Sequence, residues 1–168
     1  MPVTVGDDCD DANPGVYPGA TETCNTTDDD CDGTCDGASC RVGVHRSVGG
    51  GEHFYTTSAA EAACCGFTVE FYDYYRLYTA QLGNLIPFYR CALFGGKHLY
   101  TADVNCEGAG TNEGAMGYIA PSPICGSTPL YRLYYAATGD HFYTTSDSER
   151  ASAIAGGHVD EGTVGYVW

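Results

Sequence analysis

Carboxylate side chains that could bind a metal ion are concentrated near the start of the chain. They stand on nearly alternate residues in two runs, Asp8-Cys-Asp-Asp-Ala-Asn13 and Asp28-Asp-Asp-Cys-Asp-Gly33. Calcium takes about six to eight oxygen ligands, and a loop of alternate carboxylates with a glycine at its bend can supply them. Because neither run matches the complete helix-loop-helix pattern of such loops, we expect a calcium loop without helices. The expected ligands are Asp8, Asp10, Asn13, Glu22, Asp28, Asp30 and Asp32.

Histidine, tyrosine and threonine side chains recur together because a hexapeptide is repeated. His-Phe-Tyr-Thr-Thr-Ser occupies residues 53–58 and 141–146, and a degenerate copy, His-Leu-Tyr-Thr-Ala-Asp, occupies residues 98–103. Each copy follows an arginine and a glycine-containing turn, and Glu-Gly-x-x-Gly-Tyr follows the second and third copies. Recurrence at a nearly fixed period predicts a fold that is built from repeated units.

Each copy of the hexapeptide could contribute to a shallow carbohydrate site. Such a site needs an aromatic ring for the apolar face of the sugar and polar groups for its hydroxyls, and tyrosine supplies a ring with a polar tip. The expected contacts are Arg132, Asp140, His141 and Tyr143 in the third unit, Glu52, His53 and Tyr55 in the first, and Lys97, His98 and Tyr100 in the second. The same residues could instead form one buried polar network per unit that holds the turn in place. The sequence leaves both interpretations open.

Short strands must position these side chains. Residues 88–94, 130–135 and 141–145 are rich in aromatic and β-branched residues and lie close to glycine-containing turns, as strands do. A short helix is expected from Ser146 to Gly156, because a serine cap, a glutamate three residues later and a closing glycine fit the capping rules. Ser58 and Glu61 repeat the start of that pattern.

The repeats fill the chain after residue 40. Three units of about 43 residues span 43–87, 88–128 and 129–168. Four short strands in each unit would suit a β-trefoil, and a propeller is less favoured because it typically has about four to eight blades. We therefore expect an all-β fold, with a β-trefoil over residues 41–168 and a small disulfide-rich module over residues 1–40.

The first 40 residues form an acidic segment. They carry a formal charge of −10, whereas residues 41–168 carry −5. The few large apolar side chains of this segment cannot offset the entropy of ordering it. Either the segment is a solvated acidic tail or metal and disulfides hold it, and the alternation of aspartate with cysteine favours the second interpretation.

The cysteine content indicates where the protein works. Ten cysteines in 168 residues point to an oxidising compartment, so we expect a secreted or cell-surface protein. Five lie before residue 41 and five after it, so an odd number of bridges must join the two parts if all are oxidised, with Cys40 as the expected donor. Cys91 and Cys106 flank the second hexapeptide and are expected to pair. A zinc site is less favoured because Cys-x-x-Cys is absent.

Residues 7–36 resemble a metal-binding module that occurs in secreted and surface proteins of myxobacteria and related bacteria. The resemblance rests on the run from Asp8 to Glu22, on Cys24-Asn25 and on the run from Asp28 to Gly33. The resemblance implies metal binding and an extracytoplasmic location. The module is named after a copper-binding outer-surface protein, so the resemblance does not decide between copper and calcium. Carboxylates suit calcium, whereas copper prefers imidazole or thioether, and this module has no histidine and only one methionine, so we favour calcium.

Residues 43–168 resemble an uncharacterised repeat domain that is often appended to secreted hydrolases. The third repeat follows its pattern closely, from Tyr131-Arg132 to Tyr166. The first repeat departs from it at the Glu-Gly tail, and the second has Lys97 before its histidine. The resemblance implies binding to carbohydrate or to cell-surface polymers.

These observations favour a binding protein over an enzyme. Neither Gly-x-Ser-x-Gly nor His-Glu-x-x-His occurs, so no common hydrolase motif is present. A net charge of −15 disfavours nucleic acid and polyanions and leaves neutral or amine-bearing sugars, and no stretch is apolar enough to enter a membrane. We expect a secreted lectin that binds glycans or cell-surface polysaccharide. The alternatives are a structural or adhesive module and, less favoured, a secreted hydrolase.

Overall fold

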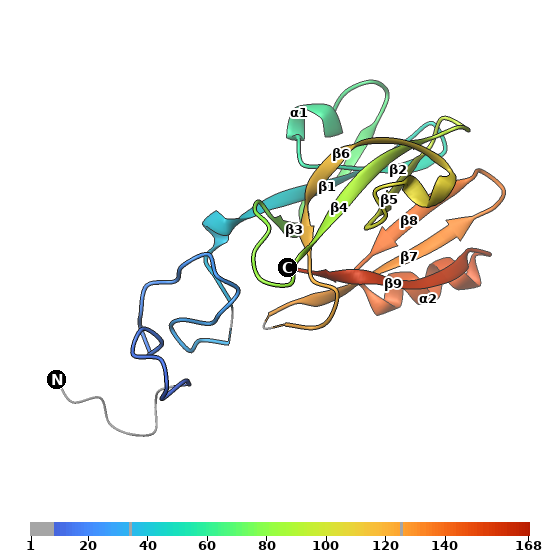
Figure 1. The fold of residues 1–168 in the computed structure, drawn as a ribbon. Helices are drawn as coiled ribbons and strands as arrows, with labels where there is room; N and C mark the ends of the chain where they lie inside the picture. The colour runs from blue at the N-terminus through green and yellow to red at the C-terminus, as the bar shows by residue number, and fades with distance from the viewer. Residues whose placement is uncertain (1–8, 34, 125) are drawn as a thin grey trace.

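The computed structural model describes residues 9–33, 35–124 and 126–168, which form the all-β fold expected from the sequence (Figure 1). The strands are β1 (Arg41–Gly49), β2 (Glu52–Thr56), β3 (Thr68–Tyr78), β4 (Ile86–Leu93), β5 (His98–Thr101), β6 (Gly110–Ile119), β7 (Thr128–Tyr135), β8 (Asp140–Thr144) and β9 (Val159–Val167). The helices are α1 (Ala59–Ala62) and α2 (Asp147–Ala155), and the short 3-10 turns are η1 (Ala38–Cys40) and η2 (Cys106–Gly108).

The strands pair in the same order in each unit. The first strand of a unit lies between the second and the third, which gives the antiparallel orders β2-β1-β3, β5-β4-β6 and β8-β7-β9. The first two units join through β3 and β6 into a six-stranded sheet, and the third unit forms a three-stranded sheet.

Each unit has one strand fewer than expected. We expected four, but the described residues form three per unit. The connections after β3 and β6 contain Gly83, Pro121 and Pro123, and these residues weaken or interrupt strand pairing. The β-trefoil therefore stays a prediction.

One arginine–tyrosine pair recurs at the same place in each hairpin. The pairs are Arg46–Tyr55, Arg90–Tyr100 and Arg132–Tyr143. The pairing of each central strand with the third strand of its unit shifts register close to this arginine. Such bulges change the direction of side chains, and the three arginines extend toward neighbouring units.

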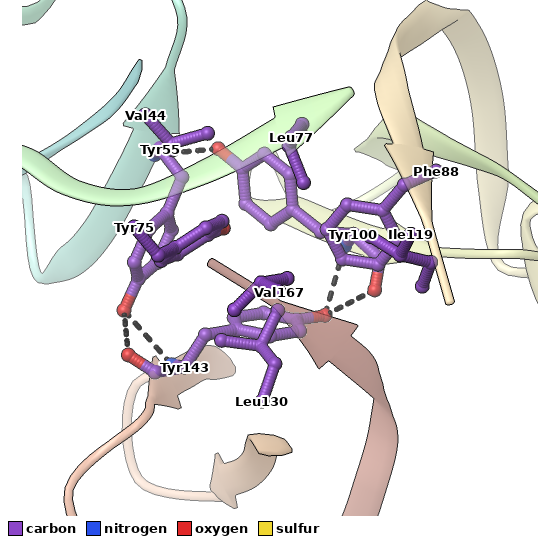
Figure 2. Packing of buried hydrophobic residues seen from close by; sticks show 10 residues of the cluster. All are labelled: Val44, Tyr55, Tyr75, Leu77, Phe88, Tyr100, Ile119, Leu130, Tyr143 and Val167. Atoms are coloured by element: carbon purple, nitrogen blue, oxygen red, sulfur yellow. Dashed lines mark hydrogen bonds between the residues drawn. The ribbon is translucent and has the colours of Figure 1, made fainter. Parts of the chain in front are cut away.

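Three tyrosines join the units at the centre of the core (Figure 2). Tyr55, Tyr100 and Tyr143 are fully buried, and their rings pack edge to face with centroids 5.2–5.4 Å apart. The Tyr55 hydroxyl donates to the main-chain oxygen of Tyr143 and accepts from its N–H, at 2.7 and 2.8 Å. The Tyr143 hydroxyl does the same at Tyr100, at 2.6 and 2.9 Å, and the Tyr100 hydroxyl accepts from the N–H of Tyr55 at 2.8 Å. A closed ring of hydrogen bonds therefore links all three hexapeptides.

The two α-helices begin where the capping pattern predicted. The hydroxyls of Ser58 and Ser146 accept from the main-chain N–H groups of Glu61 and Glu149, each at 3.2 Å. Gly156 caps the C-terminus of α2. The helix predicted from Ser146 to Gly156 is confirmed, and α1 begins at the matching serine of the first unit. The second hexapeptide ends in aspartate instead of serine, and η2 follows it.

Disulfides hold the segment before η1, which has no helix or strand in its described residues. The bridges are Cys9–Cys31 and Cys24–Cys40 in this segment, and Cys64–Cys65 and Cys91–Cys106 in the repeats. The predicted Cys91–Cys106 pair is confirmed. Cys40 was expected to cross between the two parts but pairs within its own segment, so that prediction was wrong, because η1 turns Cys40 back toward Cys24. Cys35 is also disulfide-bonded, and Cys125 lies outside the described residues.

Candidate ligand and metal sites

An arginine of each unit reaches a glutamate that follows the hexapeptide of another unit. The pairs are Arg46–Glu149 (2.7 Å from Nη2 to Oε1), Arg90–Glu61 (2.9 Å from Nη1 to Oε2) and Arg132–Glu107 (2.6 Å from Nη1 to Oε1). Each arginine also contacts a glutamate in the third strand of its own unit: Glu70, Glu113 and Glu161, at 2.9, 2.8 and 2.7 Å from Nε. Each of these three arginines thus lies between two carboxylates, one from its own unit and one from another unit.

Both partners of the most buried of these pairs stay charged at neutral pH. Burial alone would lower the pKa of Arg46, whose side chain is 3% exposed, but the hydrogen bonds to Glu149 and the nearby negative charge raise it above its usual value. Burial alone would raise the pKa of Glu149, but hydrogen bonds from Arg46 and Thr144 outweigh it and lower that pKa to about 2. This ion pair therefore links the first and third units.

The histidine that begins the hexapeptide has an acidic partner in two of the three units. Asp140 accepts from the main-chain N–H of His53 at 2.9 Å and lies 2.6 Å from its Nδ1. Glu52 contacts His98 in the same way, at 3.0 Å from the N–H and 3.2 Å from Nδ1. Each of these acids immediately precedes the histidine of a different unit. One carboxylate thus holds both the main chain and the ring of the histidine.

The third histidine lacks this partner because the corresponding residue is Lys97. His141 Nδ1 is buried and has no hydrogen-bond partner among the described residues. Lys97 donates from Nζ to the main-chain oxygen of Gly50 instead. Burial lowers the pKa of His141, and although Glu161 opposes the effect, the pKa stays below its usual value. Burial therefore favours the neutral form of the His141 ring.

A pocket of about 440 Å³ lies beside His141. Its walls come from the second and third units and are formed by Leu93, Phe94, Gly95, Lys97, Ala109, Tyr134, Thr138, Gly139, His141 and Glu161. The Phe94 side chain is 84% exposed. The Tyr134 ring packs against the His141 ring with their centroids 4.9 Å apart. Aromatic surface, a cation and a carboxylate therefore line one cavity, beside the histidine whose buried Nδ1 has no partner among the described residues.

The structure divides the ten expected carbohydrate contacts into three groups. Arg132, Asp140, Glu52, His53 and His98 take part in the ion-pair and hydrogen-bond networks between units. Tyr55, Tyr100 and Tyr143 are fully buried in the core, so the expectation that they contact a ligand directly does not fit their burial. Lys97 and His141 line the pocket. The sequence left open whether these residues form carbohydrate sites or a buried polar network. The positions of most of them fit the buried polar network.

Sequence reasoning missed the two aromatic residues of the pocket. Phe94 precedes the Gly95-Gly96 turn, and Tyr134 lies near the end of β7. A large apolar side chain directly before a glycine turn was the available signal, because such a turn projects from the sheets and leaves the side chain in solvent.

Three of the seven expected metal ligands lie together. Carboxylate oxygens of Glu22, Asp28 and Asp30 lie within 4.8 Å of one another. The Glu22 carboxylate accepts from the N–H groups of Asp30 and Asp36, at 2.9 and 2.7 Å, and so fixes the loop around the group. Three carboxylates at one point fit a hard cation that prefers oxygen ligands.

The other expected ligands are placed differently. Asp10 and Asn13 accept hydrogen bonds in local turns from the main-chain N–H groups of Ala12 and Gly15, each at 3.1 Å, and Asp10 is not part of this group. Asp32 is also not part of the group, and Asp8 lies outside the described residues. The neighbouring Asp29, which is not among the expected ligands, is buried and accepts hydrogen bonds from Thr23 and Asn25. These bonds lower the pKa of Asp29, and the bond from the Thr23 side chain contributes most.

Comparison with protein families assigns both parts of the chain. Residues 49–168 match the model of the family described as "Domain of unknown function (DUF5648)", which is more than half of the chain. The chain belongs to the DUF5648 family. Residues 8–37 match a second family, described as "Putative metal-binding motif", and Glu22, Asp28 and Asp30 all lie within that match. No curated protein and no solved structure matched this DUF5648 chain.

No helix in the described part of the DUF5648 chain combines the length and the apolar character needed to cross a membrane.

Proposed function

We propose that this protein is a carbohydrate-binding protein, secreted or on the cell surface, whose acidic module binds calcium. The pocket beside His141 carries the proposal, because it combines the exposed ring of Phe94 with polar groups on Lys97, His141 and Glu161. Aromatic surface beside a few convergent polar groups suits the apolar face and the hydroxyls of a sugar. The four described disulfides support an oxidising compartment.

We further propose that the three units surround a pseudo-three-fold axis in an arrangement related to a β-trefoil, with three strands in each unit. The repeated strand order, the recurring arginine–tyrosine pair and the tyrosine ring support this arrangement. Rotating one unit onto the next should superpose their strands one by one. Units that align over only one hairpin would contradict the arrangement.

A glycan array with matched variants tests the carbohydrate-binding proposal. Replacing Phe94 by alanine should reduce binding to the selected glycan at least tenfold, because the variant loses the ring that would stack on the sugar. It should leave stability unchanged within about 0.5 kcal/mol, because the side chain is already 84% exposed. Tyr72→Ala is the control, since its ring is 59% exposed and is not part of the pocket.

The same array separates the alternative functions. If the wild-type protein binds no glycan and the Phe94 variant behaves like the wild type, a structural or adhesive role replaces the proposal. If bound glycan is cleaved over time, the protein is a hydrolase. We expect binding without cleavage, and we expect neutral or amine-bearing polymers to bind better than nucleic acid because the net charge is −15.

Calcium should stabilise the oxidised protein. A ligand that binds only the native state at about one hundred times its Kd adds about 2.7 kcal/mol to the free energy of unfolding. Titration calorimetry should show calcium uptake that Asp28→Asn weakens strongly, because Asp28 supplies one of the three clustered carboxylates. Asp11→Asn removes the same charge outside that group and should change little. Uptake of copper without calcium would contradict the choice of metal, and equal weakening by both substitutions would contradict the site.

A further inference from the structure

We propose that the pocket beside His141 binds the carboxylate of a uronic acid residue, in the position that a side-chain carboxylate occupies in the other two units. The proposal rests on the carbohydrate-binding function above, but it replaces the neutral or amine-bearing sugars favoured by the net charge with a sugar that carries one carboxylate. It comes from comparing three equivalent histidines, of which two have an acidic partner at Nδ1 and the third has none at that atom.

The two histidines with partners show what this position is built to hold. At His53, the carboxylate of Asp140 receives the main-chain N–H at one oxygen and lies 2.6 Å from Nδ1 at the other. At His98, the carboxylate of Glu52 lies within 3.2 Å of both groups. Because a carboxylate only accepts hydrogen bonds, Nδ1 must carry the proton in both cases. The hexapeptide thus presents two N–H donors that one carboxylate satisfies.

The third position keeps the histidine but replaces the acid by a cation. Lys97 stands where Glu52 and Asp140 stand in the other units, immediately before the histidine. His141 Nδ1 is left without a partner among the described residues, although buried polar groups are nearly always hydrogen-bonded. A ligand carboxylate would satisfy Nδ1 and would also have the ammonium group of Lys97 beside it.

Of the pockets beside the three histidines, the one beside His141 has the largest volume. Its volume of about 440 Å³ exceeds the volumes of about 280 and 210 Å³ beside His53 and His98. Phe94 offers an exposed ring for stacking, and the Tyr134 ring, which also lines the pocket, packs against the His141 ring. Glu161 also lines the pocket, and its carboxylate shares Arg132 with the carboxylate of Glu107, at 2.7 and 2.6 Å, so Lys97 supplies the second cation of this group.

Side-chain movement completes the site. Nδ1 of His141 has almost no exposed surface, so a side chain that lines the pocket must move before a ligand carboxylate can reach it. Release of Lys97 Nζ from the main-chain oxygen of Gly50 would free the ammonium group for the same carboxylate. A single carboxylate per site is compatible with the acidic protein, whereas a densely charged polymer would be repelled by the net charge of −15.

NMR titration with matched small sugars tests the proposal. The probes are galacturonic acid, its methyl ester, galactose and acetate, each added to the full oxidised chain while the ring resonances of His141 are followed. We expect saturable shifts with galacturonic acid, and at least tenfold weaker binding of the ester, of galactose and of acetate. The ester and galactose lack the carboxylate, and acetate lacks the ring that would stack on Phe94.

Lys97→Glu is the decisive variant because it restores the acid found in the other units. The new carboxylate should pair with His141 and abolish the binding of galacturonic acid, while thermal unfolding shows that the variant is folded. Arg76→Glu is the control, because it makes the same change in charge at a side chain that is outside the pocket and 37% exposed. It should bind galacturonic acid as the wild type does.

The outcomes distinguish this proposal from the broader one. Equal binding of galacturonic acid, its ester and galactose would overturn the uronate assignment and leave the carbohydrate-binding function standing. Acetate that binds as tightly as galacturonic acid would overturn the sugar but keep the carboxylate. Retention of galacturonic acid binding in Lys97→Glu would place the carboxylate elsewhere and overturn the site. If no sugar binds and Lys97→Glu only raises the melting temperature, the pocket is not a sugar site, and both the carbohydrate-binding and the uronate proposals are wrong.

Discussion

Replacing Tyr143 by phenylalanine should lower the free energy of unfolding by about 2–4 kcal/mol, because two buried main-chain groups lose their partner. The Tyr143 hydroxyl donates to the main-chain oxygen of Tyr100 and accepts from its N–H, at 2.6 and 2.9 Å, and the side chain is fully buried. The phenyl ring still fills the same space, so the loss reports the hydrogen bonds and not a cavity. Chemical denaturation with urea measures it.

The control for this prediction is Tyr72→Phe, which removes the same atom from a side chain that is 59% exposed. It should change the free energy of unfolding by less than about 0.5 kcal/mol. A loss of similar size in both variants would show that the hydroxyl ring in the core contributes no more than a surface hydroxyl. Tyr55→Phe should repeat the large effect, because the Tyr55 hydroxyl bonds to the main chain of Tyr143 in the same way.

The sequence predicted the parts of the fold that depend on local pattern. The serine and glutamate spacing located the start of α2 and matches the start of α1, and the flanking cysteines located the Cys91–Cys106 bridge. Each of these depends on residues that are close in the chain. The number of strands per unit was predicted less well, because it depends on pairing between connections that contain proline and glycine.

The sequence could not show which recurring side chains face solvent. Alternation along a strand puts His141 and Tyr143 on one face. The structure buries Tyr143 completely, whereas the His141 side chain is 13% exposed. The difference arises because tyrosines from three units meet in the core. Partners such as His53 and Asp140 are 87 residues apart, and no local spacing connects them.

The Arg46–Glu149 ion pair links the first and third units. Among the ion pairs of the described residues, we expect its loss to lower the free energy of unfolding the most. Arg46 is 3% exposed, bonds to Glu149 at 2.7 and 2.9 Å and lies 2.9 Å from Glu70. Removing one partner of a buried pair costs about 3–5 kcal/mol. Because the two glutamates are 32% and 31% exposed and keep some hydration, we expect Arg46→Met to cost about 3 kcal/mol at pH 7, at the lower end of that range. Arg76→Met should cost less than about 1 kcal/mol, because Arg76 is 37% exposed and lies 3.4 Å from Asp73.

The pH dependence separates loss of the ion pair from loss of packing. Glu149 has a pKa of about 2 in the folded protein, against about 4.3 in an unfolded chain. A depressed pKa contributes stability that is present above the unfolded value and is lost as the pH falls through the folded value. In Arg46→Met this pKa should rise, because burial is then opposed by fewer hydrogen bonds. The difference in the free energy of unfolding between wild type and variant should therefore shrink between pH 5 and pH 2. A difference that stays constant over this range would mean that the methionine costs stability through poorer packing against Phe71, Tyr74 and Phe142, whose rings surround the guanidinium group.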